Sequence, residues 1–135
     1  MNLLNVEKMS KTYVDKVLFN NVTFGINERD KIGVIGINGT GKSTLLQIIS
    51  GITEEDTGTV TRGTNIKITY LPQNPVFDEK RTILENVLEC VGFAEEYWKL
   101  EGEAKSMLNK LGIPDYSGDI SVLSGGQKKR VALVR

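Results

Sequence analysis

Residues 36–43, GINGTGKS, have the residue types and spacing that can hold a chain of phosphate groups. They match the pattern G-x-x-x-x-G-K-[ST], the P-loop or Walker A motif. The glycines let successive backbone N–H groups turn toward phosphate oxygens, because no Cβ stands in the way. We therefore expect the phosphates of ATP or GTP to be bound by the loop and the residue after it: Gly36, Ile37, Asn38, Gly39, Thr40, Gly41, Lys42, Ser43 and Thr44.

Two side chains of this loop have separate roles in such a site. Lys42 would bring a positive charge to the β- and γ-phosphates, and the Ser43 hydroxyl would ligate Mg²⁺. A helix that follows the loop would add free N–H groups and a positive dipole end. The alternative is a glycine-rich turn that only joins a strand to a helix. The apolar segments on both sides of the loop favour the phosphate site.

A second glycine pair lies near the end of the sequence, in LSGGQ at residues 123–127. Ser124 is a good helix N-cap, and Gly125 and Gly126 would expose backbone N–H groups at the start of a helix. This arrangement could bind an anion, but an ordinary helix cap after a loop accounts for the same residues. On physical grounds both interpretations stay open.

Together, GINGTGKSTLL and LSGGQKKRVAL resemble the ATP-binding cassette (ABC) ATPases, whose signature is LSGGQ. The resemblance covers the whole chain and implies ATP and Mg²⁺ as cofactors. The segment KMSKTY, residues 8–13, is similar to the family's opening strand and A-loop, which implies that Tyr13 stacks on adenine. The segment YLPQNP is similar to the Q-loop, which implies that Gln73 senses Mg²⁺, with Ser43 as the other metal ligand, and the γ-phosphate. Taken singly, Tyr13 and Gln73 would be an ordinary surface tyrosine and an ordinary loop glutamine.

The resemblance also implies that the signature acts in trans. It would close over the γ-phosphate of a nucleotide bound to the P-loop of a second, facing cassette. Two ATP molecules would then lie between a head-to-tail pair of domains. The residues that would complete the partner's site are Leu123, Ser124, Gly125, Gly126 and Gln127.

Hydrolysis in this family depends on residues that follow the signature helix. The family pattern continues with an apolar strand ending in Asp-Glu (Walker B and the catalytic glutamate), a D-loop and a switch histidine. None of these is present in the 135 residues, so we assign no catalytic residue within the chain. We expect the sequence to be an N-terminal fragment of a larger ATPase, and the strand after the signature would belong beside the P-loop strand.

The motifs require an α/β framework to position them. Patterns rich in apolar and β-branched residues predict strands from residue 3, at 17–26, at 57–61 and at 66–71. The continuous apolar run at 31–36 predicts a parallel strand buried on both faces. A helix at 43–50 should bury Leu45, Leu46, Ile48 and Ile49 and end at Gly51.

Helical periodicity dominates the second half of the chain. Ile83, Val87 and Val91 fall four residues apart, and a further helix from Tyr97 to Leu111 should be ended by Gly112 and Pro114. A polar loop at 115–121 precedes a final helix that starts near Ser124. The expected fold is an incomplete ABC-type P-loop core with an N-terminal antiparallel β portion. Its parts would be a β-rich core at 1–75, a helical subdomain at 76–122, and the signature with the start of its helix at 123–135.

Composition excludes several kinds of function. Lys plus Arg and Asp plus Glu are 17 each, so the net charge is zero and gives no overall electrostatic attraction to nucleic acid. We therefore expect no direct DNA binding. A local basic run comprises Lys128, Lys129, Arg130 and Arg135, which we interpret as a solvated helix face. The absence of histidine excludes His-based catalysis and metal ligation. The single cysteine, Cys90, excludes an internal disulfide, and we expect a cytoplasmic protein.

Three readings of the parent protein remain. The first is a soluble ABC-F ATPase with tandem cassettes, a group in which many members act on ribosomes. The sequences QKKRVALVR and INGTGKSTLL favour it. Residues 77–121 look too short for the long helical arm of some ABC-F proteins, which weighs against a direct ribosomal role. The second is the ATP-binding subunit of a membrane transporter. The third is an interaction module that depends on nucleotide but does not hydrolyse it. Each implies a second cassette as partner.

We predict that the purified 135-residue chain releases no phosphate from ATP in steady state. Phosphoryl transfer depends on positioning and charge stabilisation, and the chain carries no glutamate in the position that polarises the attacking water. A phosphate-release assay with Mg-ATP tests this. Steady turnover by a preparation free of other ATPases would contradict it.

Overall fold

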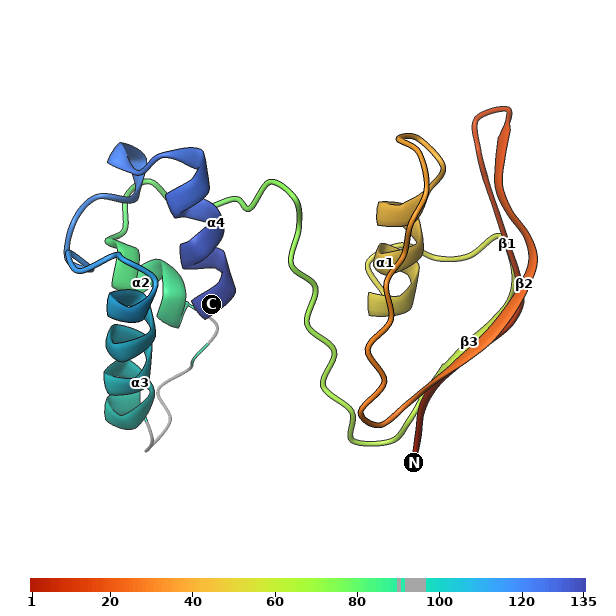
Figure 1. Ribbon diagram of the computed structural model, residues 1–135, viewed down its shortest axis with the longest axis horizontal. Coiled ribbons are helices and arrows are strands. Elements are labelled where there is room, and N and C mark those ends of the chain that lie inside the picture. The colour runs from red at the N-terminus through yellow and green to blue at the C-terminus, as the bar shows by residue number, and fades with distance from the viewer. Residues whose placement is uncertain (90, 92–96) are drawn as a thin grey trace. The chain divides into compact units, whose positions relative to one another are not determined.

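The computed structural model describes residues 1–89, 91 and 97–135, which divide into two units, Met1–Tyr70 and Leu71–Arg135 (Figure 1). Each unit has its own apolar core. Cys90, whose presence as the single cysteine excludes an internal disulfide, lies outside the described residues. The division into parts at residues 75 and 122 stays a prediction.

The first unit is built on three antiparallel strands, β1 (Asn2–Tyr13), β2 (Lys16–Asn27) and β3 (Thr57–Arg62), in the order β2-β1-β3. The predicted strands at 17–26 and 57–61 are thereby confirmed. In β1 the alternation of buried Leu4 and Val6 is interrupted before Met9, which is also buried. A β-bulge at Lys8, whose φ is 48°, absorbs the extra residue and returns Met9 to the core face.

Helix α1 (Lys42–Ser50) packs on this sheet through Ile48, which is fully buried against Leu4, Val6 and Met9. Its C-terminus is Gly51 in the left-handed conformation, φ 83°, as predicted. The Arg62 guanidinium at the end of β3 donates to the carbonyls of Ile48, at 2.8 Å, and Ile49, at 3.0 Å. Strand β3 therefore fixes the C-terminal end of the helix that follows the P-loop.

Three expectations for the first unit are wrong. Residues 31–36 do not form a buried strand: they are irregular, and Ile32, Val34 and Ile35 are 59%, 39% and 95% exposed. Residues 66–71 are also irregular. Of the apolar residues predicted to be buried in α1, only Ile48 is, and Leu46 is exposed. A strand needs hydrogen-bonded neighbours, and within the described residues the sheet consists of β1, β2 and β3 alone.

The second unit is helical, with α2 (Ile83–Leu88), α3 (Tyr97–Lys110), the short 3-10 helix η1 (Ile120–Val122) and α4 (Gly125–Val134). Its helices agree with the predicted periodicity, although α2 ends at Leu88 before Val91. The predicted polar loop at 115–121 runs into η1. The core is formed by Ile83, Val87, Leu88, Ala104, Leu108, Ile113, Ile120 and Val131. No helix among the described residues combines the length and apolarity that crossing a membrane demands.

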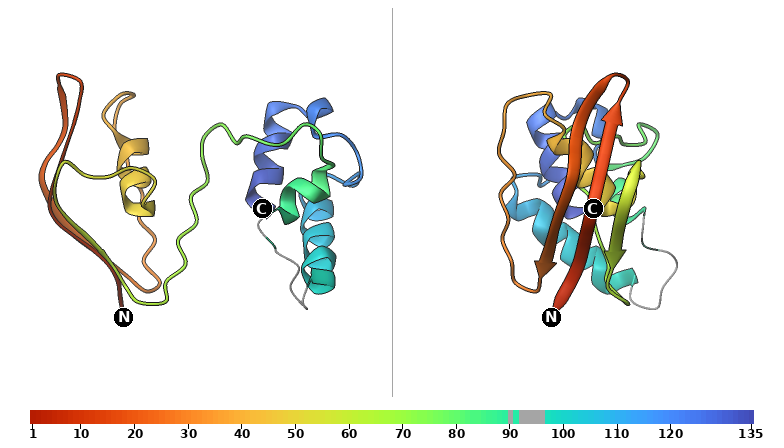
Figure 2. Two further views of the ribbon diagram at one scale, coloured as in Figure 1. Left: turned by 180° about the vertical axis from the view of Figure 1, so that it is seen from behind. Right: turned by 90° about the vertical axis from the view of Figure 1, so that its right-hand side faces the viewer.

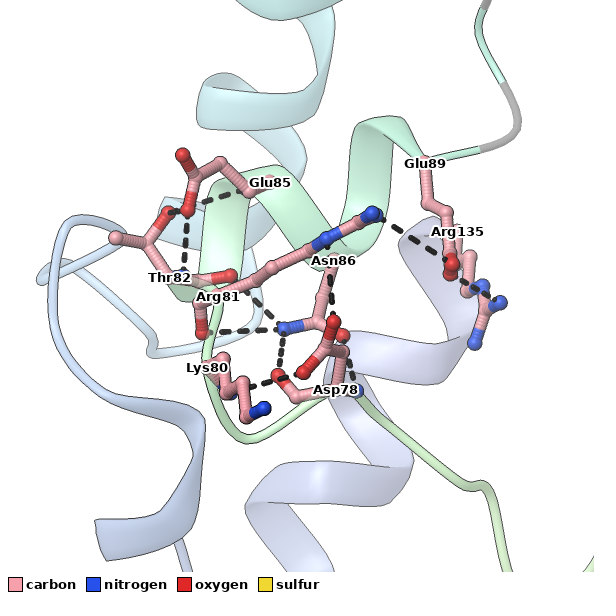
Figure 3. A network of polar contacts seen from close by, with 8 residues as sticks. All are labelled: Asp78, Lys80, Arg81, Thr82, Glu85, Asn86, Glu89 and Arg135. Carbon is pink, nitrogen blue, oxygen red and sulfur yellow. Dashed lines mark hydrogen bonds and ion pairs between the residues drawn. The ribbon is translucent and has the colours of Figure 1, made fainter.

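Asn86, the one polar residue buried among those described, organises the entry to α2 (Figure 3). Its amide nitrogen donates to the carbonyls of Asp78, Arg81 and Thr82 at 3.0–3.2 Å, and its oxygen accepts from the Asp78 N–H at 2.8 Å. Thr82 and Glu85 form a capping box at the start of the same helix. The hydrogen bonds from the Thr82 N–H and hydroxyl lower the pKa of the Glu85 carboxyl.

The basic run on α4 is only partly a solvated face, which corrects the expectation for two of its members. The Arg130 guanidinium donates to the Leu111 carbonyl at 2.7 Å, near the C-terminus of α3. The Arg135 guanidinium donates to the Val76 carbonyl at 3.0 Å and to the Glu89 carboxylate at 2.7 Å. In Figure 3 the Glu89 carboxylate joins Arg135 to Arg81.

We predict that Gly58→Ala lowers the free energy of unfolding of the first unit by more than about 2 kcal/mol. Gly58 has φ 94°, and a Cβ there would lie 2.5 Å from the Lys8 carbonyl oxygen and 2.6 Å from that of Glu7. Denaturant unfolding followed by circular dichroism measures the loss. The matched control is Gly33→Ala, because a Cβ at Gly33 meets nothing within 4 Å. Similar midpoints for the two variants would contradict the prediction.

Candidate functional site

The P-loop enters α1 through glycines in the left-handed conformation. Gly39 has φ 79° and Gly41, the residue before the helix, has φ 98°. The first helical hydrogen bond runs from the Leu45 N–H to the Gly41 carbonyl at 2.8 Å. The backbone N–H groups of Lys42, Ser43 and Thr44 thus have no acceptor inside the helix and remain available to an anion.

The Lys42 ammonium lies against the loop that precedes it. It donates to the carbonyls of Gly36 and Ile37, both at 2.8 Å, and so spans the loop from its last residues to its first. The Thr40 hydroxyl donates to the same Ile37 carbonyl at 2.9 Å. A Cβ at Gly36 would lie 3.0 Å from the Thr40 hydroxyl oxygen, so this glycine allows a close approach. The loop is therefore a closed turn with a cation at its centre.

The β1–β2 hairpin contacts this loop. The Lys16 ammonium donates to the Gly39 carbonyl at 2.7 Å. A Cβ on Gly41 would lie 3.0 Å from the Phe19 ring, so β2 packs closely on the loop at a second point. Tyr13 pairs with Lys16 across the hairpin turn and is 67% exposed. Figure 2 shows the hairpin tip and the P-loop at the same end of this unit in both views.

The strand that carries Tyr13 is fixed by an ion pair. Asp56 accepts from the Lys11 ammonium at 2.7 Å and from the Thr12 N–H at 2.7 Å. The hydrogen bond from Lys11, with that from Thr12, lowers the pKa of the Asp56 carboxyl below its usual 3.8. The pair is thus formed above this range and is lost as the pH falls through the lowered value. It holds the end of β1 beside the start of β3.

The signature segment has the geometry of a helix N-terminus open to solvent. The Ser124 hydroxyl accepts from the Gln127 N–H at 3.3 Å, and the Gln127 side chain accepts from the Ser124 N–H at 2.9 Å, a complete capping box. A Cβ at Gly125 or Gly126 would meet nothing within 4 Å. Nearby, hydrogen bonds from Ser121 lower the pKa of the Asp119 carboxyl. The two glycines are therefore exposed and have open space around them.

The predicted site residues are divided between the two units. The loop residues and Tyr13 lie in the first unit, whereas Gln73, which is exposed, and residues 123–127 lie in the second. Sequence reasoning missed Lys16, because no motif marks a lysine after the turn that follows Tyr13. It also missed Asp56, whose contact with Lys11 joins residues far apart in the sequence.

A metal ion at this site would depend on a hydroxyl and on the bound ligand for its ligands. No group of three or more Cys, Asp or Glu side chains among residues 1–89, 91 and 97–135 could hold an ion. The Ser43 hydroxyl is exposed at the first turn of α1. A single hydroxyl suits Mg²⁺ bound mainly by phosphate oxygens and water, since Mg²⁺ keeps several waters in such sites.

Comparison with known proteins identifies relatives of the chain. Residues 19–135 match the family model described as ABC transporter. The chain is 33% identical over its full length to the uncharacterized ABC transporter ATP-binding protein YfmR of Bacillus subtilis (strain 168), covering 27% of it. It is 34% identical over 99% of its length to ABC transporter F family member 5 of Arabidopsis thaliana, covering 19%.

Two further likenesses extend this result. The chain is 32% identical over 78% of its length to the energy-dependent translational throttle protein EttA of Haemophilus influenzae (strain ATCC 51907 / DSM 11121 / KW20 / Rd), covering 26% of it. A solved structure of the ATP binding subunit of an ABC transporter has a TM-score of 0.79 and 25% identity, over 98% of this chain and 60% of that one. The chain spans less than a third of the length of the curated relatives that it matches.

We predict that Ser124→Ala lowers the free energy of unfolding of the second unit by about 1 kcal/mol, because the cap of α4 is lost. Ser124→Asp should retain most of the stability, since Asp is an equally good N-cap. Thermal unfolding followed by far-ultraviolet circular dichroism measures the stability of both variants. The control Ser106→Ala changes an exposed helical serine without a hydrogen bond from its side chain in the described structure, and it should not destabilise. Equal losses for Ser124→Ala and Ser124→Asp would rule out capping as the cause.

Proposed function

The chain belongs to the ABC transporter family and carries the ATP-binding domain of an ABC ATPase, and from this we propose that it binds Mg-ATP at the P-loop. The observation that carries the proposal is the closed turn at residues 36–43. There the Lys42 ammonium lies at 2.8 Å from two loop carbonyls, directly before the free N–H groups of α1. A triphosphate is the ligand that matches a lysine ammonium next to the free N–H donors of a helix N-terminus.

The proposed roles follow from the chemistry of each group. Backbone N–H groups of residues 37–44 bind the phosphates, Lys42 neutralises the β- and γ-phosphates, and Ser43 ligates Mg²⁺. Tyr13, exposed at the end of β1, stacks on the adenine. Gln73 senses Mg²⁺ and the γ-phosphate. No residue within the chain is assigned to activate water.

We further propose that residues 123–127 close the nucleotide site of a second cassette. Support comes from the open glycines at the N-terminus of α4, whose N–H groups can face an anion on another molecule. The Ser124 and Gln127 side chains already cap their own helix, so the segment is ordered before it meets a partner. ATP would then act as a bridge between the two cassettes.

An ABC-F protein is the parent we favour. ABC transporter F family member 5 and EttA support it, and EttA is named as a translational throttle, so a ribosomal partner and a cytoplasmic location are part of this proposal. The second candidate, a subunit that serves a membrane transporter, is favoured by the likeness to an ABC transporter subunit. A second P-loop in the same polypeptide would support the first, and a single cassette encoded beside a membrane protein the second.

A third possibility concerns the 135-residue chain by itself. It contains the phosphate-binding loop and the signature but no residue for activating water. As such it would serve as an interaction module that responds to nucleotide without hydrolysing it. ATP-dependent pairing of two chains, without release of phosphate, would distinguish this activity from that of an ATPase.

We predict that Lys42→Ala weakens binding of Mg-ATP at least tenfold, because it removes the charge at the centre of the loop. Titration of the full chain with a fluorescent ATP analogue or by calorimetry measures the dissociation constant. The matched control is Lys67→Ala, which removes an exposed lysine of the same unit. Equal affinity for the wild type and Lys42→Ala would contradict the proposed function.

A further inference from the structure

The turn between β1 and β2 holds one of its residues, Val14, in an unfavourable backbone conformation. Val14 and Asp15 form the turn, and Tyr13 pairs with Lys16 on its two sides. Val14 has φ 56°, a region that β-branched residues rarely adopt. Such a conformation persists where surrounding contacts determine the backbone more strongly than the local preference does. The hairpin tip therefore needs a contact that holds it.

Lys16 provides that contact. Its side chain is exposed, yet its ammonium donates to the Gly39 carbonyl at 2.7 Å, a length typical of a charge-assisted hydrogen bond. The acceptor belongs to the P-loop, and the lysine is the pairing partner of Tyr13. The bond uses a carbonyl and leaves the N–H donors of the loop to an anion. One side chain thus connects the strand end that presents Tyr13 to the phosphate-binding loop.

Other contacts fix the end of β1 and hold β2 against the P-loop. Asp56 holds Lys11 and Thr12 immediately before Tyr13, each at 2.7 Å. The close approach of Phe19 to Gly41 holds β2 against the loop below the tip. The tip itself has only the Lys16 bond to the loop among the polar contacts of the described residues. Lys16 is therefore the one side chain of the tip that makes a hydrogen bond to the loop among the described residues.

We propose that Lys16 is a positioning residue that holds Tyr13 at a fixed distance from the P-loop, so that one nucleotide binds through its base and its phosphates together. This rests on the proposed binding of ATP at the P-loop. Two subsites held at the right spacing bind a ligand that contains both parts more tightly than subsites that move relative to each other. Lys16 should therefore matter for a nucleotide and not for a triphosphate without a base.

The test compares ATP with inorganic tripolyphosphate, both with Mg²⁺, on the full chain. Lys16→Ala should weaken ATP binding about tenfold and leave tripolyphosphate binding unchanged. Lys16→Arg, which keeps a cationic donor, should restore much of the ATP affinity. In a double-mutant cycle, the variant with both Lys16→Ala and Tyr13→Ala should bind ATP about as weakly as Tyr13→Ala alone. The ring that Lys16 positions is already absent from Tyr13→Ala.

Each alternative result has a distinct meaning. Equal losses for ATP and tripolyphosphate would overturn the proposal, because Lys16 would then act as a charge on the phosphates. Unchanged ATP binding would overturn it as well. Lys67→Ala, with the same loss of charge, should change neither affinity, and thermal unfolding verifies that each variant is folded. If Lys42→Ala weakens both ligands and Lys16→Ala weakens neither, only the role of Lys16 fails. If the wild type binds no better than Lys42→Ala, the proposed function itself fails.

Discussion

The first unit depends on how α1 is held against the sheet. Ile48 is the one residue of this helix that is fully buried, and the Arg62 guanidinium binds the carbonyls of Ile48 and Ile49. These contacts fix the C-terminal end of the helix on β1 and β3. The opposite end is left to the P-loop, whose shape comes from glycine conformations and from two lysine side chains. The stabilising contacts and the proposed phosphate site thus lie at opposite ends of one short helix.

Features that depend on local chemistry could be predicted from the sequence. The P-loop pattern, the cap at Gly51, the helix start at Ser124 and the periodicity of α3 each involve residues a few positions apart. The α/β fold class and the ABC family are confirmed for the same reason, because the motifs that identify them are short and ordered along the chain. The roles of Tyr13, Gln73 and residues 123–127 stay predictions.

Features that depend on distant residues could not be predicted. The run at 31–36 has the composition of a buried strand, but burial requires neighbours that the sheet of β1, β2 and β3 does not supply. The bond from Lys16 to Gly39 forms only when the hairpin lies against the loop, and the pair of Asp56 with Lys11 forms only when β3 pairs with β1. Neither contact leaves a pattern in the sequence, since a single lysine or aspartate is common at any surface.

The bulge in β1 constrains how this sequence can vary. Glu7 and Lys8 are both exposed, so their identities matter little to the core, but their number decides which face Met9 occupies. Gly58 lies opposite the bulge, where the carbonyls of Glu7 and Lys8 leave no room for a side chain. The residues allowed at the two positions therefore depend on each other. In a relative that lacks one residue near Lys8, the bulge is absent and position 58 can carry a side chain. We expect the two changes to occur together.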